Sequence, residues 1–324
     1  MNIGKLSNEQ LEEKVLSQIK SFRTDVVLRP GIGIDCGAVT MGGEICVFSS
    51  DPITAAQHDS GALAVTVSMN DVAAAGAQPV GLLVVVMAPP GTPEAQLTRI
   101  MQQANDTAAV HGVEILGGHT EYTDAVTRTV LCVTAIGRTK RVVSAADAKI
   151  GDALVLSKYA ALEGTGILAR DFEVRSAQVL DAQQLQRAQS VVMQLDVLRE
   201  SSIAMTHGVH AMHDVTEGGV LGAAWEMAQA SGIGIDLYQE KIPLMDETRL
   251  LCKHFDLDPY RLISSGALLM AVEDEQVLID ALQAQGIPAA CIGYFTARDK
   301  RMEQNGIWEP LEAPESDEIY KVYK

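Results

Sequence analysis

Short apolar runs alternate with helix-patterned segments along almost the whole chain, and this alternation constrains the fold more than any other feature. Strand-like runs occur at 44–50 (EICVFSS), 126–136 (VTRTVLCVTAI) and 153–156 (ALVL). Residues 93–112 have the length and spacing of a long helix. Strands that alternate with helices pack into α/β or α+β layers. We therefore predict a mixed α+β and α/β fold.

The length and the restart of the strand pattern predict two domains. The chain has 324 residues, which suffice for two domains of ordinary size. A new buried strand follows Gly151, so we expect domains at residues 1–150 and 151–324. Hydrophobic residues make up 47% of the chain and aromatic residues only 4%, so both cores must be largely aliphatic.

Charge and cysteine usage exclude several classes of partner. A net charge of -17 argues against a surface that binds nucleic acid or anionic membranes, because such surfaces need clustered Lys and Arg. The five cysteines form no CxxC pair, which favours reduced thiols in a cytoplasmic protein. The first residues, MNIGKLSNEQLEEKV, contain no apolar signal region, and no apolar run approaches the ~18 residues of a membrane span.

A carboxylate recurs at the edge of a strand or glycine turn in five places. These residues are Asp35 (GIGIDCGAV), Asp51 (FSSDPIT), Asp71 (SMNDVAAAG), Glu121 (LGGHTEY) and Asp214 (MHDVTEGGV). Carboxylates from separate loops repel one another unless a cation lies among them. Mg²⁺ prefers such hard oxygen ligands and commonly bridges to phosphates. The set therefore suggests a site for a metal-bound nucleotide.

Glycines next to these acids favour the same interpretation. Gly117 and Gly118, like Gly218 and Gly219, would let a phosphate approach backbone N–H groups, although turns also need glycine for conformational reasons. The sequence contains no GxxxxGK[ST] motif and no GxGxxG after a strand. If ATP binds, it binds through a less common arrangement.

The stretch VSMNDVAAAGAQPV also has a simpler interpretation. Asn70 or Asp71 could cap the free N–H groups at the start of a helix. The alanines that follow would let that helix lie close to a neighbouring backbone, or leave room for a ligand.

Six motifs occur in the order found in the AIR synthase (PurM-like) superfamily. They are GIGIDCGAV, SSDPIT, NDVAAAGAQPVGLL, LGGHTEY, HDVTEGGV and the long segment that begins EKIPLMDETRLL. The chain resembles this superfamily from about residue 30 to residue 296. Its C-terminal half is most similar to the hydrogenase-maturation protein HypE and HypE-like proteins.

The resemblance implies both a fold and an activity. It implies an N-terminal α+β domain that pairs with a second subunit in a homodimer, and a C-terminal α/β domain. It implies binding of ATP and Mg²⁺, and phosphorylation of an amide or carbonyl oxygen on a small molecule or on a protein. By motif position, it assigns metal and phosphate contacts to Asp35, Asp51, Asp71 and Asp214, and further cofactor contacts to Asn70, Gly117, Gly118 and Thr120.

Three departures from the family pattern affect this expectation. Relatives often carry two acids where this chain has Ile34-Asp35. His119 replaces the acid of the glycine turn, and imidazole is a poorer Mg²⁺ ligand than carboxylate, so Glu121 is the expected substitute. HypE carries a reactive cysteine on a flexible tail, whereas the last cysteine here is Cys291, in a predicted strand. We therefore do not expect the self-modification of HypE.

Two weaker patterns leave alternatives open. Lys158 follows the strand DALVLS and could contact a phosphate, or could simply be solvated. His207, His210 and His213 are three residues apart and would share one face of a helix as a metal site, although core or capping roles are more common.

The functional hypotheses are an ATP-dependent synthetase, a small-molecule kinase of the thiamine-monophosphate kinase type, and a nucleotide-binding maturation partner without turnover.

Overall fold

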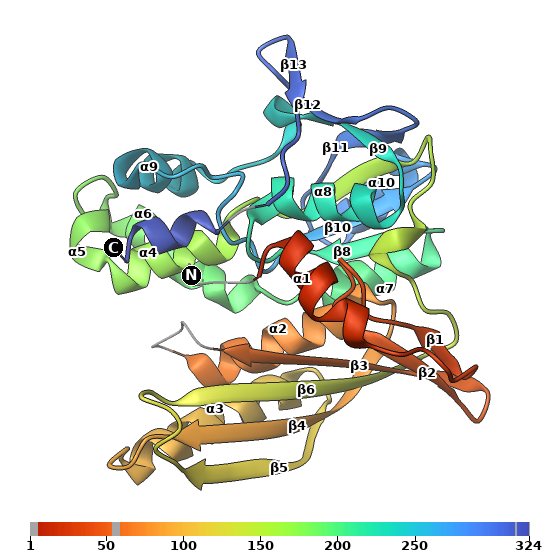
Figure 1. The fold of residues 1–324 in the computed structure, drawn as a ribbon. Coiled ribbons are helices and arrows are strands. Elements are labelled where there is room, and N and C mark those ends of the chain that lie inside the picture. Colours follow the sequence, from red (N-terminus) through yellow and green to blue (C-terminus); the bar gives the residue numbers. More distant parts are fainter. Residues whose placement is uncertain (1–5, 54–58, 315, 324) are drawn as a thin grey trace. The chain divides into compact units, whose positions relative to one another are not determined.

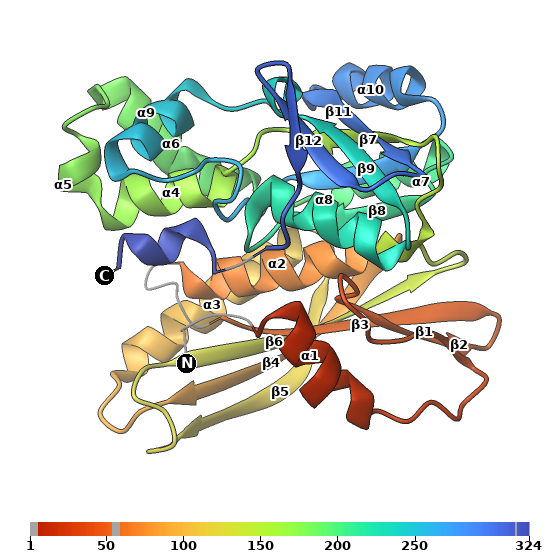
Figure 2. The same ribbon diagram turned by 45° about the horizontal axis from the view of Figure 1, so that its top comes forward.

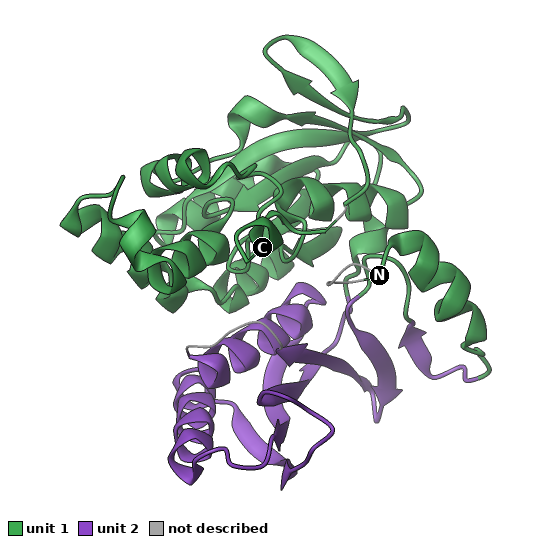
Figure 3. Ribbon diagram, turned by 60° about the vertical axis from the view of Figure 1, so that its left-hand side comes forward, with its two compact units in different colours: residues 1–22, 30–34, 143–324 green, residues 23–29, 35–142 purple. Residues whose placement is uncertain are grey.

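The computed structural model describes residues 6–53, 59–314 and 316–323, and the chain forms two compact units (Figure 3). Unit 1 comprises residues 1–22, 30–34 and 143–324, and unit 2 comprises residues 23–29 and 35–142. In the described residues, no helix is both long and apolar enough to cross a bilayer.

The two units differ from the predicted domains, residues 1–150 and 151–324, because residues 1–22 and 30–34 belong to unit 1. The change from unit 2 to unit 1 falls at Val142–Val143, near the expected boundary. Residues 30–34 nevertheless belong to unit 1, because Ile34 packs against the core of that unit. Gly33 is also close to that core, since a Cβ at this position would lie 3.3 Å from the Cβ of Glu226.

Unit 2 is built on a six-stranded sheet with the order β1-β2-β3-β6-β4-β5. Its strands are β1 (Val26–Leu28), β2 (Gly37–Met41), β3 (Glu44–Ile53), β4 (Gln78–Ala88), β5 (Glu114–Tyr122) and β6 (Val130–Thr139). All neighbours are antiparallel except β4 and β5, which are parallel. The edge strand β5 therefore follows β4 through a crossover helix.

Two helices cover one face of this sheet, as Figure 2 shows: α2 (Ser60–Ala74) and α3 (Glu94–Val110). Along β6 the side chains alternate between buried and half-buried, as expected for a sheet with a helix-covered face and an open face. Leu82, Val84 and Val86 of β4 point to the helices and are buried. Leu83, between them, is 39% exposed, so the opposite face of unit 2 carries exposed apolar side chains.

Unit 1 is built on a seven-stranded sheet with the order β13-β12-β9-β11-β7-β10-β8 (Figure 1). Its strands are β7 (Ala153–Ser157), β8 (Ala211–Asp214), β9 (Gly234–Tyr238), β10 (Leu268–Val272), β11 (Ala289–Thr296), β12 (Lys300–Gln304) and β13 (Ile307–Pro310). The central strands β7 and β10 are buried at every position, which explains their continuous apolar sequence.

Several helices of unit 1 pack into two aliphatic cores. The helices of this unit are α1 (Asn8–Lys14), α4 (Leu162–Asp171), α5 (Glu173–Ser176), α6 (Ala182–Ser190), α7 (Leu198–Thr206), α8 (Gly219–Ala230), α9 (Asp246–Phe255) and α10 (Glu275–Ala284). One core packs α8 against the sheet through residues such as Leu221 and Met227. The other joins α4, α6 and α9 with the last described segment, which contributes Ile319.

Two segments have a longer helical sequence pattern than the helices they form. The segment 7–22 begins with a Ser7–Gln10 capping box, but α1 ends at Lys14 and has no buried residue. The segment 180–201 is divided between α6, a 3₁₀ turn and the start of α7. In both cases helical spacing continues beyond the residues that form one helix.

Candidate functional site

Asn70 and Asp71 lie in the last part of α2, so the helix-start interpretation of the NDVAAAG stretch is wrong. The helix begins at Ser60 and ends at Ala74, and both polar residues are buried, at 0% and 4% exposure. Alanines follow because the helix end packs closely on the sheet: a Cβ added at Gly137 of β6 would lie 2.3 Å from Val72. The polar pair therefore faces an interior that the sequence pattern alone did not reveal.

Ser49 of β3 connects Asp71 to the sheet. The Ser49 hydroxyl donates a hydrogen bond to Oδ2 of Asp71, with an oxygen–oxygen distance of 2.5 Å. Ser49 and Asp51 are two residues apart on β3 and therefore lie on the same face of the sheet. The structure thus brings Asp51 to the side of the sheet on which Asp71 lies.

The position of Asp71 is costly for a carboxylate. Burial disfavours its charged form, and the C-terminal end of a helix carries a partial negative charge. The last turn of α2 contains no basic residue that would offset this. A buried carboxylate in this place can act as a hard oxygen ligand for a cation, and Asp51, on the same side of the sheet, offers a second such donor.

Asp35 lies on the segment that leads into β2. Gly37 is the first residue of β2 and pairs with Phe48, so the chain before Gly37 runs beside the chain that leads to Ser49 and Asp51. Asp35 is also the first residue of unit 2 after the segment 30–34. Within unit 2, the segment that carries Asp35 and the end of α2 that carries Asp71 therefore both lie beside residues 49–51 of β3.

The glycine-turn motif lies elsewhere in unit 2. Gly117, Gly118 and Thr120 form part of the edge strand β5. Gly118 and Asp51 occupy one row of the sheet but are separated by β6 and β4. Three strand spacings amount to about 14 Å, so one copy of unit 2 does not bring this motif to Asp51.

Glu121, which we expected as a metal ligand with Asp35, Asp51 and Asp71, lies on the opposite face of the unit 2 sheet from Asp51 and Asp71. Glu121 pairs with Met87, which alternates with the helix-facing residues of β4 and thus belongs to the open face. Its carboxylate lies 3.3 Å from Nε2 of His119 on the same strand. Both side chains are largely exposed, so this His–Glu pair marks the open face rather than the side covered by α2.

Asp214 ends the edge strand β8 in unit 1 and is buried at 2% exposure. The preceding residue, His213, has Nε2 3.3 Å from a carboxylate oxygen of Glu226 on α8. Its other ring nitrogen lies 4.0 Å from Asp214. Unit 1 therefore presents two acids and a histidine around the end of β8; the sequence pattern grouped His213 with His207 and His210 instead, and it did not indicate Glu226.

The Gly218–Gly219 turn is closed by protein acceptors. The Gly218 N–H donates to Asp317 and the Gly219 N–H to the Thr216 carbonyl, at 2.7 and 3.2 Å. Gly219 has φ +64°, and a Cβ there would lie 2.5 Å from the Tyr260 carbonyl oxygen, so only glycine fits. These amides are engaged in the structure rather than open to a phosphate.

Lys158 is a structural group. Its ammonium donates to the carbonyls of Gln194, Asp196 and Gly266 and pairs with Glu200 at 2.6 Å. The side chain is 14% exposed, so the solvated alternative is wrong. The nitrogen is already surrounded by acceptors, and nothing in this geometry favours a phosphate contact.

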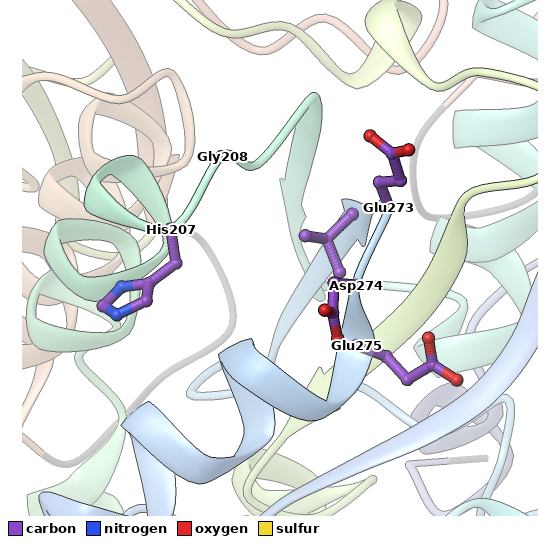
Figure 4. Close-up of a pocket in the computed structure, with 6 residues that line it drawn as sticks. His207, Gly208, Glu273, Asp274 and Glu275 are labelled. Atoms are coloured by element: carbon purple, nitrogen blue, oxygen red, sulfur yellow. The ribbon is translucent and has the colours of Figure 1, made fainter.

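The three spaced histidines do not share a helix face. His207 ends α7 and bonds the Ile203 carbonyl, His210 bonds Asp152 at 2.9 Å, and His213 lies in β8. A pocket of about 650 Å³ is lined by His207, Gly208, Val272, Glu273, Asp274 and Glu275. In Figure 4 the His207 ring points away from the carboxylates, so this pocket assembles no metal site.

Two buried carboxylates of unit 1 also escaped sequence analysis. Glu163 of α4 is 5% exposed, and Asp317 is 3% exposed. Burial, and secondarily the nearby charges of Asp317 and Glu217, raise the pKa of Glu163 to about 7. Burial also raises the pKa of Asp317 to about 6. Only the three-dimensional contacts reveal them, because neither lies in a recognisable motif.

Family models match both halves of the chain. The N-terminal domain of AIR synthase related proteins matches residues 33–139, and the C-terminal domain matches residues 149–303. The chain belongs to the AIR synthase related family. Its two-domain fold of mixed α and β structure is that of this family, and the predicted fold class and family are confirmed.

Similar proteins come from hydrogenase maturation. A Methanocaldococcus jannaschii protein assigned to hydrogenase expression/formation is 29% identical over 316 residues, covering 92% of this chain and 90% of the relative. Carbamoyl dehydratase HypE of Azotobacter vinelandii is 29% identical over 279 residues, covering 83% and 78%. The crystal structure of hydrogenase maturation protein HypE in complex with ATP superimposes with a TM-score of 0.69 at 21% identity, covering 98% and 97%.

Proposed function

We propose that the protein is a HypE-like, ATP-dependent enzyme that uses Mg²⁺ to phosphorylate an amide or carbonyl oxygen. The observation that carries the proposal is the placement of Asp51 and the buried Asp71 on one side of the sheet, where Ser49, two residues before Asp51, hydrogen-bonds Asp71. The relative named carbamoyl dehydratase and the ATP-bound structural neighbour support the choice of nucleotide and of substrate oxygen.

The chain's own residues would act by holding and orienting. Asp51 and Asp71 would hold the metal, with Asp35 from the adjoining segment, and Ser49 would fix the direction of the Asp71 carboxylate. Mg²⁺, when bound, neutralises phosphate oxygens. The substrate oxygen would form a bond to the γ-phosphorus as the bond to the β-phosphate oxygen breaks, which releases ADP. The phosphorylated oxygen then becomes a leaving group.

A homodimer would complete the site. Gly117, Gly118, Thr120 and Glu121 lie on an exposed edge strand that does not reach Asp51 in its own unit. The open face of the sheet carries Leu83 at 39% exposure and Leu116 at 57%. Such an apolar face fits burial against a second copy, which could supply its own β5 to the first.

Product analysis tests this proposal. The purified protein would be incubated with ATP, Mg²⁺ and small or protein-bound primary amides, and phosphorus NMR would identify the products. We expect ADP and inorganic phosphate that depend on the amide, and at least about a 100-fold loss in Asp71→Asn. Asp106→Asn, on an exposed turn of α3, is the control and should keep full activity.

Other outcomes select other functions. ADP with a stable phosphorylated product would instead indicate a small-molecule kinase. ATP binding without consumption, for every substrate and partner offered, would contradict the proposal and favour a nucleotide-binding maturation partner.

A further inference from the structure

The segment that follows β13 folds back over the glycine turn before α8. We call residues 311–314 and 316–322 the strap. Leu311 is buried in the core beside α8, and Ile319 is buried in the core formed by α4, α6 and α9. The strap therefore joins the two cores of unit 1, and it does so across the Gly218–Gly219 turn.

Polar contacts fix the strap at this turn. Asp317 accepts the Gly218 N–H at 2.7 Å and the Ile319 N–H at 2.8 Å. The Tyr320 hydroxyl donates to Glu217 at 3.0 Å. Pro314 lies close to the turn: a Cβ added at Gly218 would be 3.1 Å from the Cβ of Pro314. The strap thus covers the turn, and its Asp317 carboxylate accepts a hydrogen bond from the Gly218 N–H.

The strap and the turn do not pack tightly at every point. A pocket of about 220 Å³ lies where they meet, lined by Gly218, Arg261, Glu312, Ala313, Ser316 and Glu318. A segment next to unfilled space lacks van der Waals contacts that would otherwise hold it in place. The strap is therefore attached mainly at its two buried apolar residues and through Asp317.

A buried carboxylate lies under this attachment. Glu163 of α4 is hydrogen-bonded to Ser265 through one oxygen, while Oε2 has no hydrogen-bond partner among the described residues. The charged groups that act on it are both acidic: Asp317 from the strap and Glu217 from the turn. An ionised Glu163 would thus repel the carboxylate by which the strap holds the turn.

The other charges near the strap do not relieve this repulsion. Lys321 pairs with Glu318 at 2.6 Å, and the charges of Arg261 and Lys321 act on Asp258. Glu318 accepts the Asp258 N–H on the same side. A proton on Glu163 is therefore the simplest way to neutralise the cluster while the strap is in place.

We propose that the strap is a detachable closure over the Gly218–Gly219 turn, held in place while Glu163 is protonated and released when Glu163 ionises. Release frees the Gly218 N–H, which is otherwise bonded to Asp317. This inference does not depend on ATP turnover, because it concerns contacts within unit 1 alone.

Hydrogen exchange of the full chain tests the proposal. Protection factors of strap peptides, corrected for intrinsic exchange, would be compared at pH 5.5 and pH 7.5. Glu163 binds its proton more tightly while the Asp317 carboxylate of the strap lies nearby, so release of the strap becomes more favourable as pH rises. We expect at least about a tenfold loss of protection at the higher pH.

Glu163→Gln should reduce the loss of strap protection between the two pH values, because an amide cannot ionise; the smaller remainder comes from Asp317, whose own pKa is raised to about 6 by burial. Asp317→Asn, which removes the facing charge, should also weaken the pH dependence and serves if the first variant does not fold. Glu312→Gln removes an exposed acid from the same segment and should behave like the wild type. Equal wild-type protection at both pH values, or an undiminished pH dependence in both cluster variants, would overturn the proposal.

Discussion

Asp71 lies buried in the last turn of α2, where neither burial nor the helix dipole favours a carboxylate. Ser49 compensates in part by donating a hydrogen bond from β3. Lys158 differs from Asp71, because its sequence position suggests a phosphate contact but three backbone carbonyls and Glu200 already bind its ammonium group. At this scale, the partners of a side chain distinguish a site from a structural role.

Ser49→Ala should impair catalysis without unfolding the protein. Loss of the hydrogen bond leaves the Asp71 carboxylate less firmly oriented and costs about 1 kcal/mol of stability. We expect roughly a tenfold lower rate of ATP consumption, because the effect acts through Asp71. Ser50→Ala is the matched control: Ser50 precedes Asp51 but bonds Thr134 on the other face, and its loss should leave the rate unchanged.

Lys158→Met should destabilise unit 1 and leave ATP affinity unchanged in the folded protein. The substitution leaves the 2%-exposed side chain of Glu200 without its cation, which costs about 3 kcal/mol for a buried pair. Chemical denaturation measures the loss, and calorimetric titration measures ATP affinity. A variant of normal stability that no longer binds ATP would show that Lys158 contacts the nucleotide after all.

Among the helices and strands, β5 has an exposure and a sequence motif that a single subunit does not explain. It is an edge strand with eight of its nine residues exposed, and it contains the glycine motif that the family resemblance assigns to the cofactor. Helices α2 and α3 lie on one face of the sheet, and apolar side chains remain on the other. The proposed dimerisation through that open face would account for both observations.

Leu83→Glu should therefore convert a dimer into a monomer. A carboxylate in the centre of an apolar interface would raise the dimer dissociation constant by about 100-fold or more. Light scattering after size-exclusion chromatography measures the change. Val110→Glu, at the 81%-exposed end of α3, is the control and should remain dimeric. A wild-type protein that is monomeric at every concentration would contradict the proposed interface.

Elements with strong patterns were predictable, and contacts between distant residues were not. The continuous apolar runs of β7 and β10 indicate buried strands, and the capping box at Ser7 marks the start of α1. The place of Asp71 at the end of α2 was missed, because alanine and glycine after NDV suit either end of a helix. One feature of Ser49 was predictable: side chains alternate along a strand, so Ser49 and Asp51 lie on the same face of the sheet.

For the whole molecule, the cluster around Glu163 couples stability to pH. The pKa of Glu163 is raised from 4.5 to about 7 in the folded protein. Between these values the folded state binds more protons than the unfolded state, so the free energy of unfolding falls as pH rises. The contribution is fully present below about pH 4.5 and is lost above about pH 7.

Glu163→Gln should accordingly match the wild type near pH 5 and exceed it near pH 8. The difference at pH 8 should be at most about 3 kcal/mol, since a unit of pKa shift corresponds to about 1.4 kcal/mol. Urea denaturation at the two pH values measures it. If the variant is less stable than the wild type by the same amount at both, Glu163 is ionised in the folded protein.

Asp51 and Asp71 are the residues that we propose to hold a magnesium ion together with ATP. Calorimetric titration of ATP, with Mg²⁺ and with EDTA, into the wild type, Asp51→Asn and Asp71→Asn tests it directly. We expect binding by the wild type only with Mg²⁺, and at least about a 100-fold weaker affinity in each variant. Equal ATP affinity with and without Mg²⁺, or unchanged affinity in both variants, would contradict the claim.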